Sequence, residues 1–362
     1  MGRTPLTFST TLSKGLLALL VLAAAFLPWI MHVHAQSASP QPAQTNTSQG
    51  KSSDQNPDQN PRQDENPQTF KVEVNVVNIL FNVKDKHGAL VPNLKREDFG
   101  LFEDGQKQTI KYFTAENDLP LTLGILIDTS GSQQRVLPIE QEVGAAFLKS
   151  IIRKKDLAFV INFDVNVELI QDLTSSTRDL KQALDSVKIN TGGGGGTVPG
   201  LGGGPFPTGT PRGTLLYDAV YLAGGEKLSH EVGRKAMIIL TDGEDQGSKM
   251  KIEQAIEAAQ KADVICYVLL IADRGFYGFG GYSGDREMRK LAEETGGRVI
   301  DVGNREDKLQ EGFKQIGDEL RSQYSIGYTP TNSKRDGTFR KIEIKAKAGK
   351  VQARKGYYAP KK

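Results

Sequence analysis

The sequence is poor in the residues that build disulfide frameworks and soft metal sites. Its 362 residues include one cysteine, Cys266, and four histidines. A single cysteine excludes disulfide pairs, zinc ribbons, CxxC redox motifs and iron–sulfur ligation within the chain. Two of the histidines fall in an N-terminal segment that we expect to be removed, so any catalytic triad depends on His87 or His230.

A strong charge of either sign is also missing, as are several catalytic motifs. The sequence has 46 Lys and Arg residues and 43 Asp and Glu residues, which gives a net charge of +3. This balance predicts no nucleic-acid partner and no general attraction to acidic membranes. Neither GxSxG nor GxxxxGK[ST] occurs, so the sequence contains neither the nucleophile elbow of α/β-hydrolases nor the P-loop of nucleotide-binding proteins.

The first 68 residues predict export followed by a spacer. Residues 1–35 have basic residues, an apolar run over 15–30 and small residues before Gln36, as in a cleaved secretory signal peptide. An uncleaved anchor is the alternative, but the run is shorter than the roughly 20 residues of a membrane span and contains Pro28. Residues 36–68 have no large apolar side chain and predict a disordered linker. We therefore expect a secreted or periplasmic protein with no membrane contact beyond the signal segment.

Two short β-rich segments flank a longer middle region. Residues 69–117 and 323–362 alternate apolar and polar side chains as half-buried strands do, and Asp104-Gly105 predicts a hairpin turn between strands at 99–103 and 108–113. Each segment is small for an independent sheet domain. We expect the two to pair into one β-sandwich with the middle domain inserted, and two separate flaps are the alternative.

The middle region, residues 118–322, alternates strands with helices. Continuous apolar runs at 121–128 and 235–241 are typical of strands buried on both faces, whereas 157–163 and 167–173 are close enough to form a hairpin. The pattern predicts an α/β fold with a doubly wound, mostly parallel six-stranded sheet and one antiparallel edge. The remaining expected elements are helices at 138–152, 177–187, 214–228, 248–262, 285–295 and 306–321 and strands at 263–271 and 298–302.

Two of the buried strands end in aspartate, at Asp128 and Asp242. In a doubly wound sheet these are the first and fourth strands, which lie side by side at the switch point where ligands bind. Asp128-Thr-Ser130-Gly-Ser132 then places further oxygen-bearing side chains at alternate positions, and Thr214 adds a hydroxyl at a predicted helix start. Hydroxyl and carboxylate oxygens suit a hard divalent cation such as Mg²⁺, with Mn²⁺ and Ca²⁺ as alternatives.

These residues resemble the metal-ion-dependent adhesion site of von Willebrand factor type A domains, over roughly residues 120–322. The five positions are Asp128, Ser130, Ser132, Thr214 and Asp242. The flanks, including EDGQKQTIKYF and ARKGYY, resemble secreted bacterial members of this group. The resemblance implies that Ser130, Ser132 and Thr214 bind the ion directly and that the two aspartates act largely through waters. An Asp or Glu carboxylate from a partner protein would then complete the coordination.

Two glycine-rich segments, 191–213 and 274–284, are expected at the rim of this site. Their composition is typical of flexible loops. The alternative is a mobile aromatic surface that grips a partner, built from Phe206, Phe276, Tyr277, Phe279 and Tyr282.

The function that these features predict is non-enzymatic, metal-dependent protein binding. One alternative is a Mg²⁺-dependent hydrolase or phosphotransferase with Asp128 as nucleophile, but such sites use a second carboxylate where this chain has Ser130. Another alternative is a metal-free structural scaffold. Cys266 lies inside a predicted strand and is expected to be a buried thiol with no reactive role.

Overall fold

The structure is a computed structural model that describes residues 76–116, 118–190, 213–271 and 284–361. All of these residues belong to one compact unit of the chain. The predicted signal segment, the linker, the strand residues before Val76 and most of both glycine-rich segments lie outside the described residues. Among the described residues, no helix combines the length and the apolar character needed to cross a membrane.

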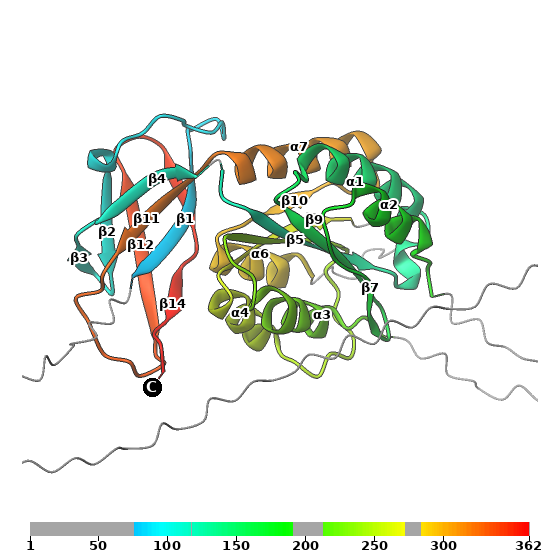
Figure 1. Cartoon of the computed structure of the whole chain (residues 1–362). Helices are drawn as coiled ribbons and strands as arrows, with labels where there is room; N and C mark the ends of the chain where they lie inside the picture. Colours follow the sequence, from blue (N-terminus) through cyan, green and yellow to red (C-terminus); the bar gives the residue numbers. More distant parts are fainter. Residues whose placement is uncertain (1–75, 117, 191–212, 272–283, 362) are drawn as a thin grey trace, which may run out of the picture. The chain divides into compact units, whose positions relative to one another are not determined.

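The middle region forms a six-stranded sheet with the order β10-β9-β8-β5-β6-β7 (Figure 1). Only the β6–β7 pair is antiparallel, because three residues connect these two strands. The fold class and the hairpin edge predicted from the sequence are therefore confirmed. The strands are β5 Leu121–Asp128, β6 Leu157–Phe163, β7 Val167–Thr174, β8 Arg234–Thr241, β9 Val264–Leu270 and β10 Val299–Asp301.

Helices cover both faces of this sheet, and each face has its own apolar core. On β5, Leu123, Ile125 and Ile127 pack with α1, α2 and α7, whereas Leu126 packs on the other face with α3, α4 and α6. Figure 1 shows these two groups of helices on opposite sides of the sheet. The helices are α1 Leu137–Ile151, α2 Thr177–Ser186, α3 Leu216–Leu222, α4 Ile252–Lys261, α6 Gly284–Thr295 and α7 Glu306–Arg321, with a π-helical turn, η3, at Ala223–Leu228 after α3.

The two flanking segments form one β-sandwich, because each of its sheets contains strands from both. One sheet has the order β13-β1-β11-β4 and the other β14-β12-β2-β3, and they share one apolar core. The N-terminal strands are β1 Val77–Lys84, β2 Phe99–Glu103, β3 Gln106–Gln108 and β4 Tyr112–Glu116, with a short 3-10 turn, η1, at Arg96–Asp98. The C-terminal strands are β11 Gln323–Tyr328, β12 Phe339–Ala346, β13 Lys350–Ala353 and β14 Gly356–Tyr358.

One predicted strand of the sandwich is wrong. The sequence predicts a single strand over 108–113, but β3 ends at Gln108 and pairs with β2, while β4 starts at Tyr112 and pairs with β11 in the other sheet. The chain crosses between the sheets here, and Lys111 N donates to Gly327 O as it arrives. A local pattern cannot show such a crossing, since both halves alternate in the same way.

A buried carboxylate joins α7 to the sandwich. The Glu319 side chain is 2% exposed and pairs with Lys84 of β1 at 2.8 Å and with Arg298 at 2.6 Å. Asn82 Nδ2 donates to Glu319 O at 2.9 Å. These contacts fix the end of the last helix against the first strand of the sandwich.

Candidate metal centre

The site begins at Asp128, the last residue of β5, whose side chain is fully buried. Its Oδ1 accepts a hydrogen bond from Ser130 N at 2.9 Å, and this contact turns the chain tightly after the strand. Its Oδ2 accepts from Thr241 Oγ1 at 2.7 Å, at the end of the neighbouring strand β8. Asp128 is therefore held by both central strands of the sheet.

The two serines of the same loop connect Asp128 to the second aspartate. Ser130 and Ser132 Oγ atoms lie 2.9 Å apart, and Ser132 Oγ donates to Asp242 Oδ2 at 2.6 Å. Ser132 lies in the short 3-10 turn η2, Gly131–Gln133, and Asp242 directly follows β8. Asp242 Oδ1 accepts from Glu244 N at 3.1 Å. The structure thus brings Asp128, Ser130, Ser132 and Asp242 together at the carboxyl edge of the sheet.

Thr214 lies at the same edge but not at a helix start as predicted. Thr214 N donates to Gln246 O at 3.0 Å, and Thr214 O accepts from Gln246 N at 2.9 Å. These two bonds connect Thr214 to the loop that follows Asp242. The next residue, Leu215, donates its N–H to Asp164 O, and Asp164 Oδ2 accepts from Thr129 Oγ1 at 2.9 Å. The helix begins only at Leu216. Within the described residues, no hydrogen bond joins the Thr214 hydroxyl to the other four side chains.

The electrostatics of these residues suit a cation. Burial, together with the negative charge of Asp242, raises the pKa of Asp128 from 3.8 to about 7, although hydrogen bonds from Ser130 and Thr241 oppose the rise. A divalent ion beside both carboxylates would reverse this effect, because it favours their ionised forms. The described residues contain no group of three or more His, Cys, Asp or Glu side chains placed to hold a metal. The three hydroxyls and two carboxylates of the predicted set are oxygen donors of the kind that a hard divalent ion prefers.

Glu140 is a third acidic residue near this site that the sequence did not reveal. It lies in the first turn of α1, is 1% exposed, and neither carboxyl oxygen has a hydrogen-bond partner. Burial raises its pKa well above the ordinary value, and the charges of Asp128 and Asp242 add to the rise. A glutamate within an otherwise amphipathic helix carries no signal of its position, so only the packing of α1 on the sheet shows it.

Three other sequence features can be placed in the structure. Asp218, which the sequence puts near Thr214, accepts from Lys249 N at 3.1 Å and Met250 N at 2.8 Å and so anchors the segment before α4. The helix α4 begins at Ile252, later than the predicted 248, and Lys251 N at its start donates to Gln254 Oε1 at 2.9 Å. Cys266 is fully buried as predicted, and burial raises the pKa of its thiol to about 12. The proposed aromatic rim residues lie outside the described part of the chain.

Comparisons with known proteins find similarity in structure alone. No protein-family model matches the chain, and no curated protein is similar to it in sequence. The conserved hypothetical protein BatB from Bacteroides thetaiotaomicron is 18% identical, with a TM-score of 0.42, over 56% of this chain and 100% of that chain. A von Willebrand factor type A protein from Catenulispora acidiphila is 12% identical, with a TM-score of 0.42, over 79% and 74%.

A third similar structure is proximal thread matrix protein 1 from the mussel byssus, solved with a zinc-occupied MIDAS motif. It is 18% identical, with a TM-score of 0.44, over 60% of this chain and 50% of that chain. These likenesses are distant, so the strand order and connections described above carry the fold assignment. The fold is a doubly wound α/β fold with a mostly parallel six-stranded sheet and an attached β-sandwich.

Proposed function

We propose that this protein is a non-enzymatic binding module that uses a divalent cation to hold an acidic side chain of a partner protein. The supporting observation is the chain of contacts from Asp128 through Ser130 and Ser132 to Asp242, across two neighbouring strand ends. Thr214 joins the same edge through its backbone bonds to Gln246. Residues from three separate loops thus lie at one edge of the sheet, and four of them are connected through their side chains.

In this proposal Ser130, Ser132 and Thr214 bind the ion directly, and Asp128 and Asp242 act largely through waters. Three neutral hydroxyls neutralise none of the charge of a Mg²⁺ ion, which keeps several exchangeable positions when it has few protein ligands. The bound ion would supply a coordination position for a carboxylate. An Asp or Glu of a partner provides the charge that the hydroxyls lack. Mg²⁺ fits this donor set best, with Mn²⁺ and Ca²⁺ as alternatives.

A binding role is favoured over catalysis by what surrounds the site. A hydrolytic serine needs a base within hydrogen-bond reach, but His87 is exposed in the turn after β1 and His230 is exposed in the connection from η3 to β8. Asp128 as a phosphotransfer nucleophile would need an accessible carboxylate, and its side chain is fully buried.

The place of action follows from the sequence rather than from the described residues. Residues 1–35 have the pattern of a secretory signal peptide. We therefore assign the binding function to the periplasm or the cell exterior, where partner proteins and divalent cations are both available.

The experiment is capture of partners by the immobilised chain with and without a chelator. Thr214→Ala removes one hydroxyl and keeps the backbone bonds of residue 214. Ser229→Ala is the matched control, because Ser229 is exposed between η3 and β8, at the opposite edge of the sheet. Partners should be retained by the wild type and Ser229→Ala and lost on chelation or with Thr214→Ala. Converting the acidic contact residue of such a partner to its amide should abolish capture, and undiminished capture by the amide form would contradict the proposal.

A further inference from the structure

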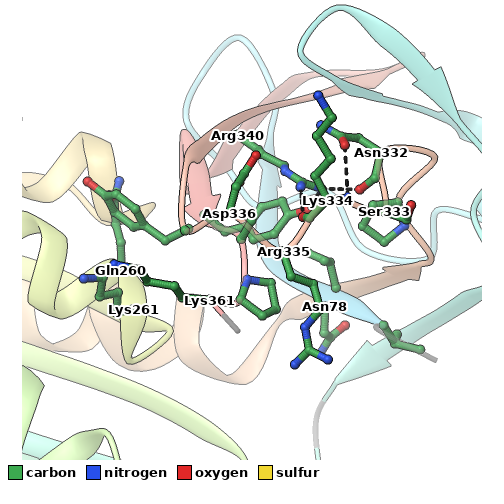
Figure 2. Close-up of a pocket in the computed structure, with 18 of the residues that line it drawn as sticks. Asn78, Gln260, Lys261, Asn332, Ser333, Lys334, Arg335, Asp336, Arg340 and Lys361 are labelled. Carbon is green, nitrogen blue, oxygen red and sulfur yellow. Dashed lines mark hydrogen bonds between the residues drawn. The ribbon is translucent and has the colours of Figure 1, made fainter. Parts of the chain in front are cut away.

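A large pocket lies away from the candidate metal centre, where the β-sandwich meets the end of α4. Its volume is about 930 Å³, within the range of about 300–1,000 Å³ that small-molecule sites occupy. The walls come from the start of β1, the loop between β11 and β12, β14 and the end of α4. Figure 2 shows Gln260 and Lys261 on one side and Asn332, Ser333 and Lys334 on the other.

The lining is strongly basic. Seven Lys and Arg side chains and three Asp and Glu side chains line the pocket, and one of the seven, Arg340, also pairs with the buried Glu103 at 3.5 Å, whereas the whole chain has a net charge of only +3. Positive charge is therefore concentrated here. The basic residues are Lys111, Lys261, Lys334, Arg335, Arg340, Arg354 and Lys361, and the acidic residues are Glu257, Asp263 and Asp336.

Several of these cations are not neutralised by the acidic residues of the lining. Glu257 pairs with Lys261 at 2.6 Å, and Asp263 pairs with Arg354. Lys334 and Lys361 form no ion pair with any described residue, and Lys111 Nζ donates only to the neutral Thr329 Oγ1, at 3.0 Å. Three ammonium groups therefore remain available to an anion.

The wall that carries Lys334 is held in place without a ligand. The guanidinium group of the buried residue Arg340 donates to the carbonyl oxygens of Asn332 and Lys334. Gln108 fixes the same loop, since its Nε2 donates to Thr331 Oγ1 at 2.9 Å and its Oε1 accepts from Thr331 N at 3.1 Å. Such preorganisation lowers the cost of ordering the loop on binding.

Two of the basic side chains in this wall are almost fully buried. Arg340 and Arg354 have side chains that are 3% and 10% exposed, and the Nε of each has no acceptor. The uncharged lining adds amides at Asn78, Gln260 and Asn332. One end of each amide is already bonded within the protein, through Asn78 Oδ1, Gln260 Nε2 and Asn332 Oδ1, which leaves the other end to pair with a sugar hydroxyl. Tyr357 and Tyr358 supply aromatic rings.

We propose that this pocket binds an acidic saccharide, with its carboxylate or sulfate groups at Lys111, Lys334 and Lys361. The hydroxyl groups of the sugar pair with the amides of the wall. A saccharide is favoured over an acidic peptide, because its many hydroxyl groups match the amides of Asn78, Gln260 and Asn332 and the hydroxyl groups of Thr329 and Ser333 in the lining. This site needs no metal, so its binding is independent of the candidate metal centre.

The test is calorimetric titration of the full chain in the presence of a chelator. The probes are trigalacturonate for carboxylates, a sulfated disaccharide for sulfates, neutral maltotriose, and a triglutamate peptide. The variant is the Lys334→Gln/Lys361→Gln double substitution, and the matched control is Lys341→Gln/Lys345→Gln, on the exposed face of β12. All four lysines are exposed, so both variants should fold.

We expect saturable binding of at least one acidic saccharide, about tenfold or more weaker in the pocket variant and unchanged in the control. Whether trigalacturonate or the sulfated disaccharide binds more tightly shows whether the pocket prefers carboxylate or sulfate groups. The proposal is overturned if neither acidic saccharide binds, if maltotriose or triglutamate binds as tightly, or if the pocket variant binds like the wild type.

Discussion

We expect the Asp128→Asn variant to be more stable than the wild type without metal. When metal is abundant, the variant should be the less stable of the two. In the folded chain the pKa of Asp128 is raised from 3.8 to about 7, chiefly by burial and then by the charge of Asp242. Because this pKa is raised by folding, the stability that the protonated Asp128 side chain contributes is fully present below about pH 4. That contribution is lost as the pH rises from about 4 through 7. Above pH 7 the ionised side chain therefore costs about 4 kcal/mol of folding free energy.

Asparagine removes that cost but keeps only part of the hydrogen bonding. Its carbonyl oxygen can still accept from Ser130 N, whereas its amide cannot accept from Thr241 Oγ1, a loss of about 1 kcal/mol. The net gain in unfolding free energy is then about 3 kcal/mol at pH 8 in chelator, and about 1 kcal/mol or less at pH 5. Metal binding stabilises the wild type by about 2.7 kcal/mol at 100 times Kd and about 4.1 kcal/mol at 1,000 times Kd. The two stabilities should therefore cross as Mg²⁺ is added.

The assay is urea unfolding followed by circular dichroism at pH 5 and pH 8, in chelator and across a Mg²⁺ series. Asp156→Asn is the matched control, because Asp156 is 1% exposed but its carboxylate accepts from Arg153 Nε at 2.8 Å. Burial opposes ionisation there, yet the hydrogen bonds and charge of Arg153 keep the pKa of Asp156 below its ordinary value. That variant should be less stable than the wild type with or without metal. If Asp128→Asn is also less stable by the same amount in both conditions at pH 8, the reasoning is refuted.

Two further substitutions test the surroundings of the site and the packing of the sheet. In chelator, Glu140→Gln should be as stable as the wild type near pH 4 and more stable at pH 8. The pKa of Glu140 is raised in the folded chain, so its ionisation lowers stability as the pH rises. Equal pH profiles of the two proteins in thermal melts would contradict this. Gly297→Ala should lower the unfolding free energy by about 3 kcal/mol or more, because the added Cβ would lie 1.9 Å from Cys266 O. Gly225→Ala, which meets nothing within 4 Å, should change stability little in the same denaturant titration, and similar losses in both glycine variants would contradict the steric argument.

Much of the sheet and most of the candidate site could be predicted from local patterns. The runs ending at Asp128 and Asp242 are mostly apolar, so the burial of the strands and the position of the aspartates at the strand ends follow from the sequence. The alternation in β12 likewise matches its alternating exposure. In each case the information lies within one short segment.

What could not be predicted depends on contacts between distant segments. Thr214 lies outside the helix because its backbone pairs with Gln246, 32 positions later. The strand predicted over 108–113 is divided because the residues from Tyr112 onward pair with β11 in the other sheet. The basic pocket joins Asn78 to Lys361, and no pattern within either segment indicates the other. Such features become visible only when the chain is folded.

The central claim is that hydroxyls and carboxylates from three loops hold a divalent cation, and calorimetric Mg²⁺ titration of the full chain tests it most directly. We expect saturable binding of one ion by the wild type and by Ser229→Ala, and a loss of affinity of about tenfold or more in Thr214→Ala, whose hydroxyl is a proposed direct ligand. The absence of saturable heat with Mg²⁺ and with Mn²⁺ in the wild type, or equal affinity in Thr214→Ala, would contradict the account.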